Sequence, residues 1–260
     1  MRSLSTIERV GVHCSSIRHV SSLHWKSNNC PFSNFCPLVL VSNEDRVTST
    51  ADRNFAPGLI LHKAALYDMQ VWLFTLGRES GFREKILRLA RLEPGEAILD
   101  VGCGTGTLAI AAKRHVGPTG SVCGIDASPQ MIARANRKAR KAGVEIVFNT
   151  GAAQAIPFSD ACFDVVLNTL MLHHLPRKAR QQCASEMRRV VKPGGRVLAV
   201  DFGERTQKST GPLGRFHRHG GVSAREIVGL LSEAGFQSVE SGLVGTRGLQ
   251  FGFAKAASGL

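Results

Sequence analysis

The sequence predicts an α/β fold built on a doubly wound, mostly parallel sheet. The first observation is a strand, a glycine-rich turn and a helix in direct succession at residues 97–113. The second is another short apolar strand, at residues 121–126, that ends in an acid. The third is that strand and helix patterns continue to alternate up to residue 202. This alternation is typical of parallel sheets whose strands are joined by crossover helices.

The length of 260 residues and the hydrophobic content of 43% suit one α/β domain with extensions. We expect residues 1–50 to form a poorly ordered extension and residues 51–260 to form the domain. The extension is serine-rich and poor in acids, and it lacks the apolar core of a secretory signal. A mitochondrial transit peptide, a tail and translation from an upstream start all fit this composition. We therefore expect a cytoplasmic protein, with a mitochondrial location as the alternative if residues 1–50 act as a transit peptide.

The cysteine and charge patterns restrict the partners. Seven scattered cysteines show no metal-ligand spacing, so we expect no structural metal and a reducing compartment. The formal charge of +13 favours anionic partners such as nucleic acid or a membrane surface. However, the densest basic run, residues 134–141, falls on a predicted helix, where such runs are usually solvated. We expect no nucleic-acid partner and leave peripheral membrane contact open.

The most apolar stretch, residues 57–76, precedes the glycine-rich turn. Its length approaches that of a membrane span, but His62, Lys63 and Asp68 interrupt it. We therefore predict one or two amphipathic capping helices and no transmembrane segment. A further helix with apolar residues at helical spacing, at residues 78–91, should lead into the first strand.

Three glycines at alternate positions form the turn after the first strand. Gly102, Gly104 and Gly106 let the backbone turn sharply and approach a ligand, and the following helix directs its free N–H groups at that ligand. The G-x-G-x-G spacing differs from that of dinucleotide enzymes, and no Gly-Lys-Ser/Thr follows for a phosphate. Asp100 lies within the motif. The pattern predicts a loop for a nucleotide-like cofactor.

Asp126 ends the second strand. In open α/β sheets ligands lie outside the carboxyl ends of the strands, where an acid accepts hydrogen bonds from ribose hydroxyls. The same acid would serve NAD, so Asp126 predicts a nucleoside without selecting the cofactor.

The remaining elements follow from apolar periodicity, caps and breakers. Ser128 should cap a helix that ends near Gly143, and Ser223 should cap the last helix, residues 224–234. Lys192-Pro-Gly-Gly195 should turn the chain between a helix and a strand. The other predicted elements are strands at 144–148, 163–167 and 196–202, a helix at 178–191, and strands at 237–244 and 249–254.

Several motifs, in their order along the chain, resemble the class I S-adenosylmethionine-dependent methyltransferases. They are Asp100 with its glycines, Asp126, Gly151–Phe158, Asn168–Leu175 and Lys192–Gly195. The resemblance covers roughly residues 57–256 and is nearest to the ubiquinone/menaquinone-biosynthesis C-methyltransferases and their small-molecule relatives. It implies a Rossmann-like class I methyltransferase fold with a C-terminal antiparallel hairpin, and S-adenosyl-L-methionine as cofactor.

The resemblance also implies the cofactor site. Asp100 would organise the methionine end, because a carboxylate suits an ammonium and a sulfonium. Ala127 and Met131 would line the adenine. Ala152 departs from the Asp or Asn of many relatives, so one hydrogen bond, worth about 1 kcal/mol, is lost unless backbone near Ala153 replaces it. The predicted cofactor-binding residues are Asp100, Gly102, Cys103, Gly104, Gly106, Asp126, Ala127, Met131, Ala152, Ala153, Asn168 and Thr169.

Two residues are candidates for the chemistry. His173 suits proton abstraction from an acceptor hydroxyl or amine, whereas packing is the competing role for one of the adjacent histidines. Some relatives acting on quinones or lipids carry a pair like Tyr67-Asp68, which implies that Tyr67 faces the acceptor, although an aromatic packed on the sheet is an equal alternative. We expect methyl transfer by in-line displacement to a small hydrophobic acceptor such as a quinone- or lipid-like molecule. A dehydrogenase and a methyltransferase-fold binding module without turnover are the rivals.

Overall fold

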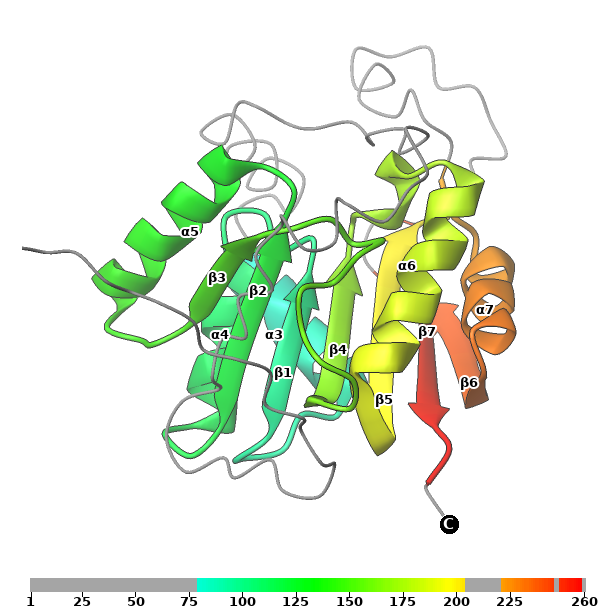
Figure 1. The fold of residues 1–260 in the computed structure, drawn as a ribbon, viewed down its shortest axis with the longest axis horizontal. Helices are drawn as coiled ribbons and strands as arrows, with labels where there is room; N and C mark the ends of the chain where they lie inside the picture. Colours follow the sequence, from blue (N-terminus) through cyan, green and yellow to red (C-terminus); the bar gives the residue numbers. More distant parts are fainter. Residues whose placement is uncertain (1–78, 204–220, 246–247, 259–260) are drawn as a thin grey trace, which may run out of the picture. The chain divides into compact units, whose positions relative to one another are not determined.

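The structure, a computed structural model, describes residues 79–203, 221–245 and 248–258. Its seven-stranded sheet has the order β3-β2-β1-β4-β5-β7-β6 (Figure 1). The elements are α3 (Glu79–Ala90), β1 (Ala97–Val101), α4 (Thr107–Val116), β2 (Ser121–Asp126), α5 (Pro129–Ala142), β3 (Val147–Thr150), β4 (Phe163–Thr169), the 3-10 helix η1 (Leu172–His174), α6 (Arg177–Val190), β5 (Val191–Phe202), α7 (Ala224–Glu233), β6 (Phe236–Leu243) and β7 (Leu249–Ala256).

The predicted fold class is confirmed. Strands β1 to β5 pair in parallel, while β7 runs antiparallel to both β5 and β6. The predicted closing hairpin is therefore β6–β7. The capping helices expected at residues 57–76, and Tyr67 with them, lie outside the described residues.

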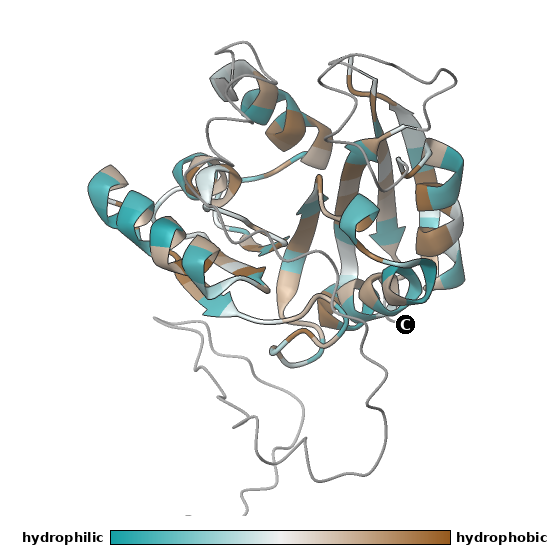
Figure 2. Cartoon of the chain, turned by 90° about the horizontal axis from the view of Figure 1, so that it is seen from above, coloured by the Kyte–Doolittle hydropathy of each residue, from teal (hydrophilic) through white to brown (hydrophobic). Residues whose placement is uncertain are grey.

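Apolar side chains from the two faces of the sheet form two core clusters. Helices α3, α4 and α5 contribute to one cluster, and α6 and α7 contribute to the other. Along β1, Ile98 belongs to the first cluster and Leu99 to the second, as the twofold alternation of a strand requires. Figure 2 shows brown, apolar segments among the central strands and teal, polar segments along the helices. The alternation therefore directs Asp100 toward the face that α3 and α4 cover.

Helix α5 begins and ends at the predicted residues. The Ser128 hydroxyl accepts a hydrogen bond from the Met131 N–H, and Pro129 occupies the first turn. Gly143 adopts the left-handed conformation after the last turn. These are the local devices that the sequence predicts, since a hydroxyl satisfies a free N–H and a glycine accepts positive φ at low cost.

Strand β3 starts three residues later and ends two residues later than predicted. The β-branched content favours residues 144–148, but β3 runs from Val147 to Thr150. Its register joins Cys123 to Val147 and Asp126 to Thr150. The boundaries follow this pairing with β2, which local propensity does not report.

The predicted turn at Lys192-Pro-Gly-Gly195 is wrong in its placement. Helix α6 ends at Val190, and these residues lie within β5, which starts at Val191. Val191 pairs with Phe163 and Arg196 with Val165, so the motif forms a bulge opposite Asp164. The bulge requires its glycines: Gly194 has φ +76°, and a Cβ on Gly195 would lie 2.8 Å from the Asp164 carbonyl oxygen.

Within the part of the chain that the structure describes, no helix is both long enough and apolar enough to cross a membrane.

Candidate functional site

The glycine loop between β1 and α4 is fixed by bonds within the protein. The N–H groups of Gly102 and Cys103 both donate to the Ile125 carbonyl, at 2.8 and 2.9 Å, and the Gly106 N–H donates to the Cys103 carbonyl. The Gly104 N–H donates to Asp126 Oδ2 at 2.9 Å. These four amides already have acceptors, so they do not form a nest for a phosphate group.

Two of the loop glycines are required by packing inside the protein. Gly102 has φ +76°, and a Cβ there would lie 2.5 Å from Met171 Cγ. Gly106 has φ +75°, and a Cβ would lie 2.7 Å from Phe148 Cζ and 2.9 Å from Ala135 Cβ. Real Cβ atoms do not approach so closely, and positive φ already disfavours a side chain. The glycines thus bring the loop against β3, α5 and the segment after β4.

Asp126 is held at the carboxyl end of β2, as predicted. Its Oδ2 accepts from the Gly104 N–H and its Oδ1 from the Ser128 N–H, both at 2.9 Å. Burial raises the pKa of this carboxyl, and the two N–H bonds oppose the rise. Each oxygen has a second lone pair, so the carboxylate is oriented by the loop and can still accept from hydroxyl groups.

Asp100 is the most unusual acid of the site. It is 1% exposed, and neither carboxylate oxygen accepts a hydrogen bond of normal geometry from the described residues. Burial raises its pKa to about 7, opposed by the charge of Arg83 and the backbone N–H of Ala109 and reinforced by the charge of Asp126. A buried carboxyl without a strong partner is costly, and such groups concentrate at functional sites.

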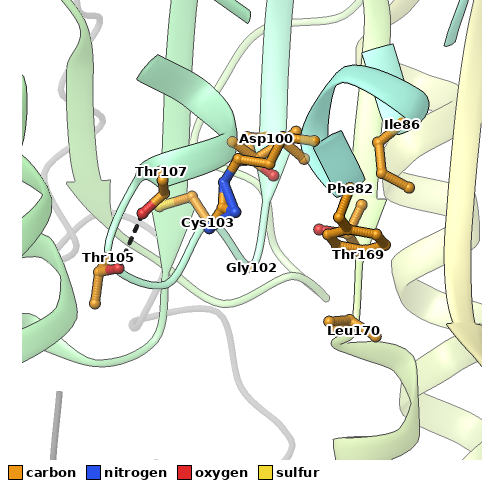
Figure 3. A pocket seen from close by; sticks show the side chains of 11 residues that line it. Phe82, Ile86, Asp100, Gly102, Cys103, Thr105, Thr107, Thr169 and Leu170 are labelled. Atoms are coloured by element: carbon orange, nitrogen blue, oxygen red, sulfur yellow. Dashed lines mark hydrogen bonds between the residues drawn. The ribbon is translucent and has the colours of Figure 1, made fainter. Parts of the chain in front are cut away.

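A pocket opens beside Asp100 at the carboxyl ends of β1 and β4 (Figure 3). Figure 3 shows Phe82 and Ile86 of α3 on one side, with Thr105 of the glycine loop and Thr107 at the start of α4 on the other. The lining residues are Phe82, Arg83, Ile86, Asp100, Gly102, Cys103, Thr105, Thr107, Leu108, Thr169 and Leu170. The pocket thus combines an acid, polar hydroxyls and an apolar wall.

Four of the predicted cofactor-binding residues line this pocket: Asp100, Gly102, Cys103 and Thr169. Burial raises the pKa of the Cys103 thiol well above its ordinary value. Because the thiolate is the reactive form, Cys103 is suited to fill space in the loop and poorly suited to act as a nucleophile. Lys138 of α5 donates to Thr105 Oγ1 at 3.0 Å and also to Thr107 Oγ1, which ties the loop to α5.

The other predicted cofactor residues lie along the neighbouring strand ends, outside the pocket lining. The Gly151 N–H donates to the Asp126 carbonyl at 3.0 Å, so the segment with Ala152 and Ala153 starts beside Asp126. Ala127 is exposed, whereas Met131 is buried in the first turn of α5. The strand order β3-β2-β1-β4 places all of these residues along one edge of the sheet.

Asn168 is fully buried at the end of β4. Its Nδ2 donates to the Val101 carbonyl at 3.1 Å, while its Oδ1 accepts no hydrogen bond from the described residues. After Thr169, Leu170 takes a left-handed conformation with φ +56°, uncommon for a branched residue. This reversal directs Met171 back onto Gly102 and leads into η1.

His173 of η1 contacts an acid that the sequence analysis did not single out. Its Nδ1 lies 2.7 Å from Asp201 Oδ1, and its backbone N–H donates to Asp201 Oδ2 at 3.0 Å. Asp201 is fully buried near the end of β5. The adjacent ring of His174 lies 3.9 Å from that of His173, centroid to centroid.

Sequence reasoning missed Arg83, Thr105, Thr107 and Asp201. A signal existed for the two threonines, which lie inside the recognised loop. In the sequence, Arg83 cannot be told from the other charged residues of an amphipathic helix, and Asp201 cannot be told from any polar residue near the end of an apolar strand. Only their tertiary neighbours distinguish them.

Comparisons with known proteins agree with this geometry. Residues 98–195 match the family model of a methyltransferase domain. A demethylmenaquinone methyltransferase from Lactobacillus johnsonii is 34% identical over 157 residues, which cover 60% of this chain and 62% of that protein. A ubiquinone/menaquinone biosynthesis C-methyltransferase from Bdellovibrio bacteriovorus is 33% identical over 156 residues, with 59% and 64% covered. The chain therefore spans slightly less than two thirds of the length of these curated relatives.

Among solved structures, an S-adenosylmethionine-dependent methyltransferase from Aquifex aeolicus has a TM-score of 0.62 with this chain. The two are 23% identical, and the match covers 75% of this chain and 97% of the other. At that identity the likeness concerns the fold alone.

Proposed function

We propose that the chain is an S-adenosyl-L-methionine-dependent methyltransferase, as its motifs predict, and that it transfers a methyl group to a small hydrophobic acceptor. Because the matched region is shorter than the curated relatives, the activity of the whole chain and its acceptor belong to this proposal.

Asp100 carries the proposal. Its carboxylate oxygens are buried beside the pocket and accept no hydrogen bond of normal geometry from the described residues, so a cationic ligand group would stabilise them. S-adenosyl-L-methionine has an ammonium and a sulfonium at its methionine end. We assign that end to the pocket between the glycine loop and α3, with Asp100 as its principal acid.

The loop geometry disfavours the rival dehydrogenase. A pyrophosphate needs several free backbone N–H groups, but those of Gly102, Cys103, Gly104 and Gly106 already have acceptors inside the protein. Asp126 would hold the ribose with its remaining lone pairs. Ala127, Met131, Ala152 and Ala153 remain the predicted surroundings of the adenine.

Orientation would supply most of the rate. When bound, the cofactor supplies a methyl group that is already activated, so the chain mainly has to hold the acceptor atom about 3 Å from it and exclude water. Thr169 at the end of β4, Leu170 directly after it and Phe82 of α3 form the pocket wall that could hold the acceptor in this position. His173 is the proposed base, and Tyr67 stays a predicted acceptor contact.

We propose a quinol- or phenol-like acceptor. Support comes from the names of the two curated relatives, which refer to demethylmenaquinone and to ubiquinone/menaquinone biosynthesis. The apolar pocket wall of Phe82, Ile86 and Leu170 is compatible with an aromatic ring.

A methyltransferase-fold binding module without turnover is the second candidate. Ala152 favours it, because a methyl side chain at that position cannot bond the adenine amino group. The two candidates differ in turnover and agree in cofactor binding.

The first experiment is thermal unfolding of the full chain with S-adenosylmethionine, with S-adenosylhomocysteine and with NAD. A ligand at 100 times its Kd adds about 2.7 kcal/mol to the free energy of unfolding, so the midpoint should rise. We expect a rise with the first two ligands and none with NAD. Asp126→Asn should weaken cofactor affinity about tenfold, whereas Glu145→Gln, at an exposed position, is the matched control. A rise with NAD alone would overturn the cofactor assignment.

The second experiment measures formation of S-adenosylhomocysteine with a panel of reduced quinones and phenols. Acceptor-dependent product confirms an enzyme and ranks acceptor classes. Cofactor binding without product from any acceptor would instead favour the binding module.

A lipid-like acceptor would bring the protein to a membrane surface. We propose peripheral contact through basic side chains of α5, where Arg137, Arg140 and Lys141 are exposed and the helix carries no acid. Co-sedimentation with vesicles that contain phosphatidylglycerol, against pure phosphatidylcholine vesicles, tests this contact. Microscopy of tagged chains with and without residues 1–50 separates the cytoplasmic from the mitochondrial prediction.

A further inference from the structure

His173 and Asp201 lie together because β4 and β5 are parallel neighbours. The Leu170 N–H donates to the Val200 carbonyl at 2.8 Å, which keeps the chain after β4 against the end of β5. The ring of His173 then lies between Asp201 and Phe202, at 2.7 Å from the acid oxygen and 5.3 Å from the Phe202 ring centroid. The pair joins residues that are 28 positions apart in the sequence.

Asp201 accepts three N–H groups in this arrangement. Oδ2 accepts from the His173 backbone N–H, while Oδ1 accepts from the Phe202 N–H at 2.7 Å and lies 2.7 Å from His173 Nδ1. A carboxylate can only accept, so the ring nitrogen facing it must donate. His173 therefore carries its proton on Nδ1.

Helix α6 also holds the turn that carries His173 in place. Arg180 Nε donates to the Leu172 carbonyl at 2.9 Å and to the Leu175 carbonyl at 2.8 Å. Arg180 Nη1 pairs with Glu226 at 2.6 Å. Both ends of η1 are thus fixed to α6 and α7. The His173 side chain keeps 12% exposure, and its Nε2 has no hydrogen-bond partner among the described residues.

From this geometry we propose that Asp201 is the positioning residue of a His173–Asp201 dyad, in which Nε2 of His173 is the base that takes the acceptor's proton. This inference rests on the proposed function. The acceptor O–H proton moves to Nε2, and the oxygen keeps the bonding pair. In a phenol or quinol that pair raises electron density on the ring carbons, one of which forms the new bond to the methyl group as the S–C pair returns to sulfur. That ring carbon then loses its own proton to solvent and the ring regains its aromaticity.

The position of the proton tests the dyad without any acceptor. Nitrogen-15 spectra of the full chain, labelled at its nine histidines, report which ring nitrogen of each neutral imidazole carries hydrogen. The signals absent from His173→Ala identify His173. We expect a protonated Nδ1 and an unprotonated Nε2. A protonated Nε2 in the wild type would overturn the proposal, whatever the acceptor proves to be.

Kinetics test the role of Asp201. In Asp201→Asn an amide group replaces one acceptor, so a donor faces either the ring or a backbone N–H, and kcat should fall about 10²–10⁴-fold while the Kd for S-adenosylmethionine stays within twofold. An unchanged kcat in a variant that unfolds at or near the wild-type temperature would overturn the proposal. Since this buried change could unfold the protein, the spectra of the wild type provide an independent result.

Chemical rescue distinguishes a base from a packing residue. His173→Ala should lose activity and regain part of it when imidazole is added, because a free ring can occupy the vacated space. His174→Ala is the matched control, and imidazole should not raise its activity. Absence of rescue for His173→Ala would contradict the assignment of Nε2 as base. Absence of turnover in the wild type, with protonated Nδ1 present, would instead remove the proposed function and leave the paired geometry intact.

Discussion

At the scale of single residues, the buried carboxyl of Asp100 lowers the stability of the folded protein. Asp100 has a pKa near 7 in the folded chain against an ordinary value of 3.8. Between these values the folded state binds the proton and the unfolded state does not, so stability must fall as pH rises. The contribution approaches about 1.4 kcal/mol per pH unit for one proton and levels off above the folded pKa.

We predict that Asp100→Asn removes this slope. Without ligand, the variant should unfold at higher urea concentration than the wild type at pH 8, and the difference should shrink toward pH 4. Its affinity for S-adenosylmethionine should nevertheless fall at least tenfold. Urea titrations at several pH values, with calorimetry for binding, measure both effects. A stability difference independent of pH would contradict the electrostatic account of Asp100.

Gly102 provides a second prediction at this scale. Gly102→Ala should destabilise the fold by about 1–3 kcal/mol more than Gly143→Ala, because only the first Cβ meets another side chain. Both positions have positive φ, so the backbone cost is shared. In a Met171→Ala background the excess should disappear, as measured by a double-mutant cycle. An excess that persists there would show that Met171 is not the source.

Secondary-structure elements meet the site through their ends. The 3-10 helix η1 is a single turn, so its own hydrogen bonds hold its geometry weakly. Arg180 of α6 stabilises it by donating hydrogen bonds to the carbonyl oxygens of Leu172 and Leu175. Arg180→Met keeps the apolar stem and removes those bonds. We expect a loss of about 1–3 kcal/mol and faster hydrogen exchange at the amides of His174 and Leu175.

Arg177→Met is the control for that prediction, since Arg177 is exposed on the same helix. It should change stability by less than about 0.5 kcal/mol. Equal effects of the two variants would show that charge on α6, and not the bonds to η1, is responsible.

At the scale of the whole molecule, β7 joins the parallel half of the sheet to its antiparallel edge. Phe253 is 1% exposed, pairs with Leu198 of β5 and Glu240 of β6, and belongs to the core cluster beneath α3. The Arg91 guanidinium lies 4.3 Å from its ring centroid. The hairpin should therefore unfold together with the rest of the described domain.

We predict that Phe253→Ala destabilises the protein by about 3–5 kcal/mol in one cooperative transition. Leu243→Ala, at a position 71% exposed in β6, should cost less than about 0.5 kcal/mol. Circular dichroism and fluorescence should report the same midpoint for each variant. Two separate transitions would show that the hairpin is an independent unit.

The sequence by itself determined the order of elements, the class of sheet and the residues at its carboxyl edge. These follow from local chemistry: apolar runs, the caps at Ser128 and Gly143, and the glycine spacing around Gly104 act over a few residues. Asp100 and Asp126 were found for a similar reason, because Asp100 lies within the glycine motif and Asp126 ends an apolar strand.

Only the tertiary structure decided which side chains meet. The bulge at Lys192–Gly195 and the bounds of β3 depend on pairing with β4 and β2, which local propensity does not contain. The charge interaction of Arg83 with Asp100 and the contact of Asp201 with His173 join residues on different elements. Such pairs arise because parallel strands bring their carboxyl ends to one edge of the sheet, however far apart their residues lie along the chain.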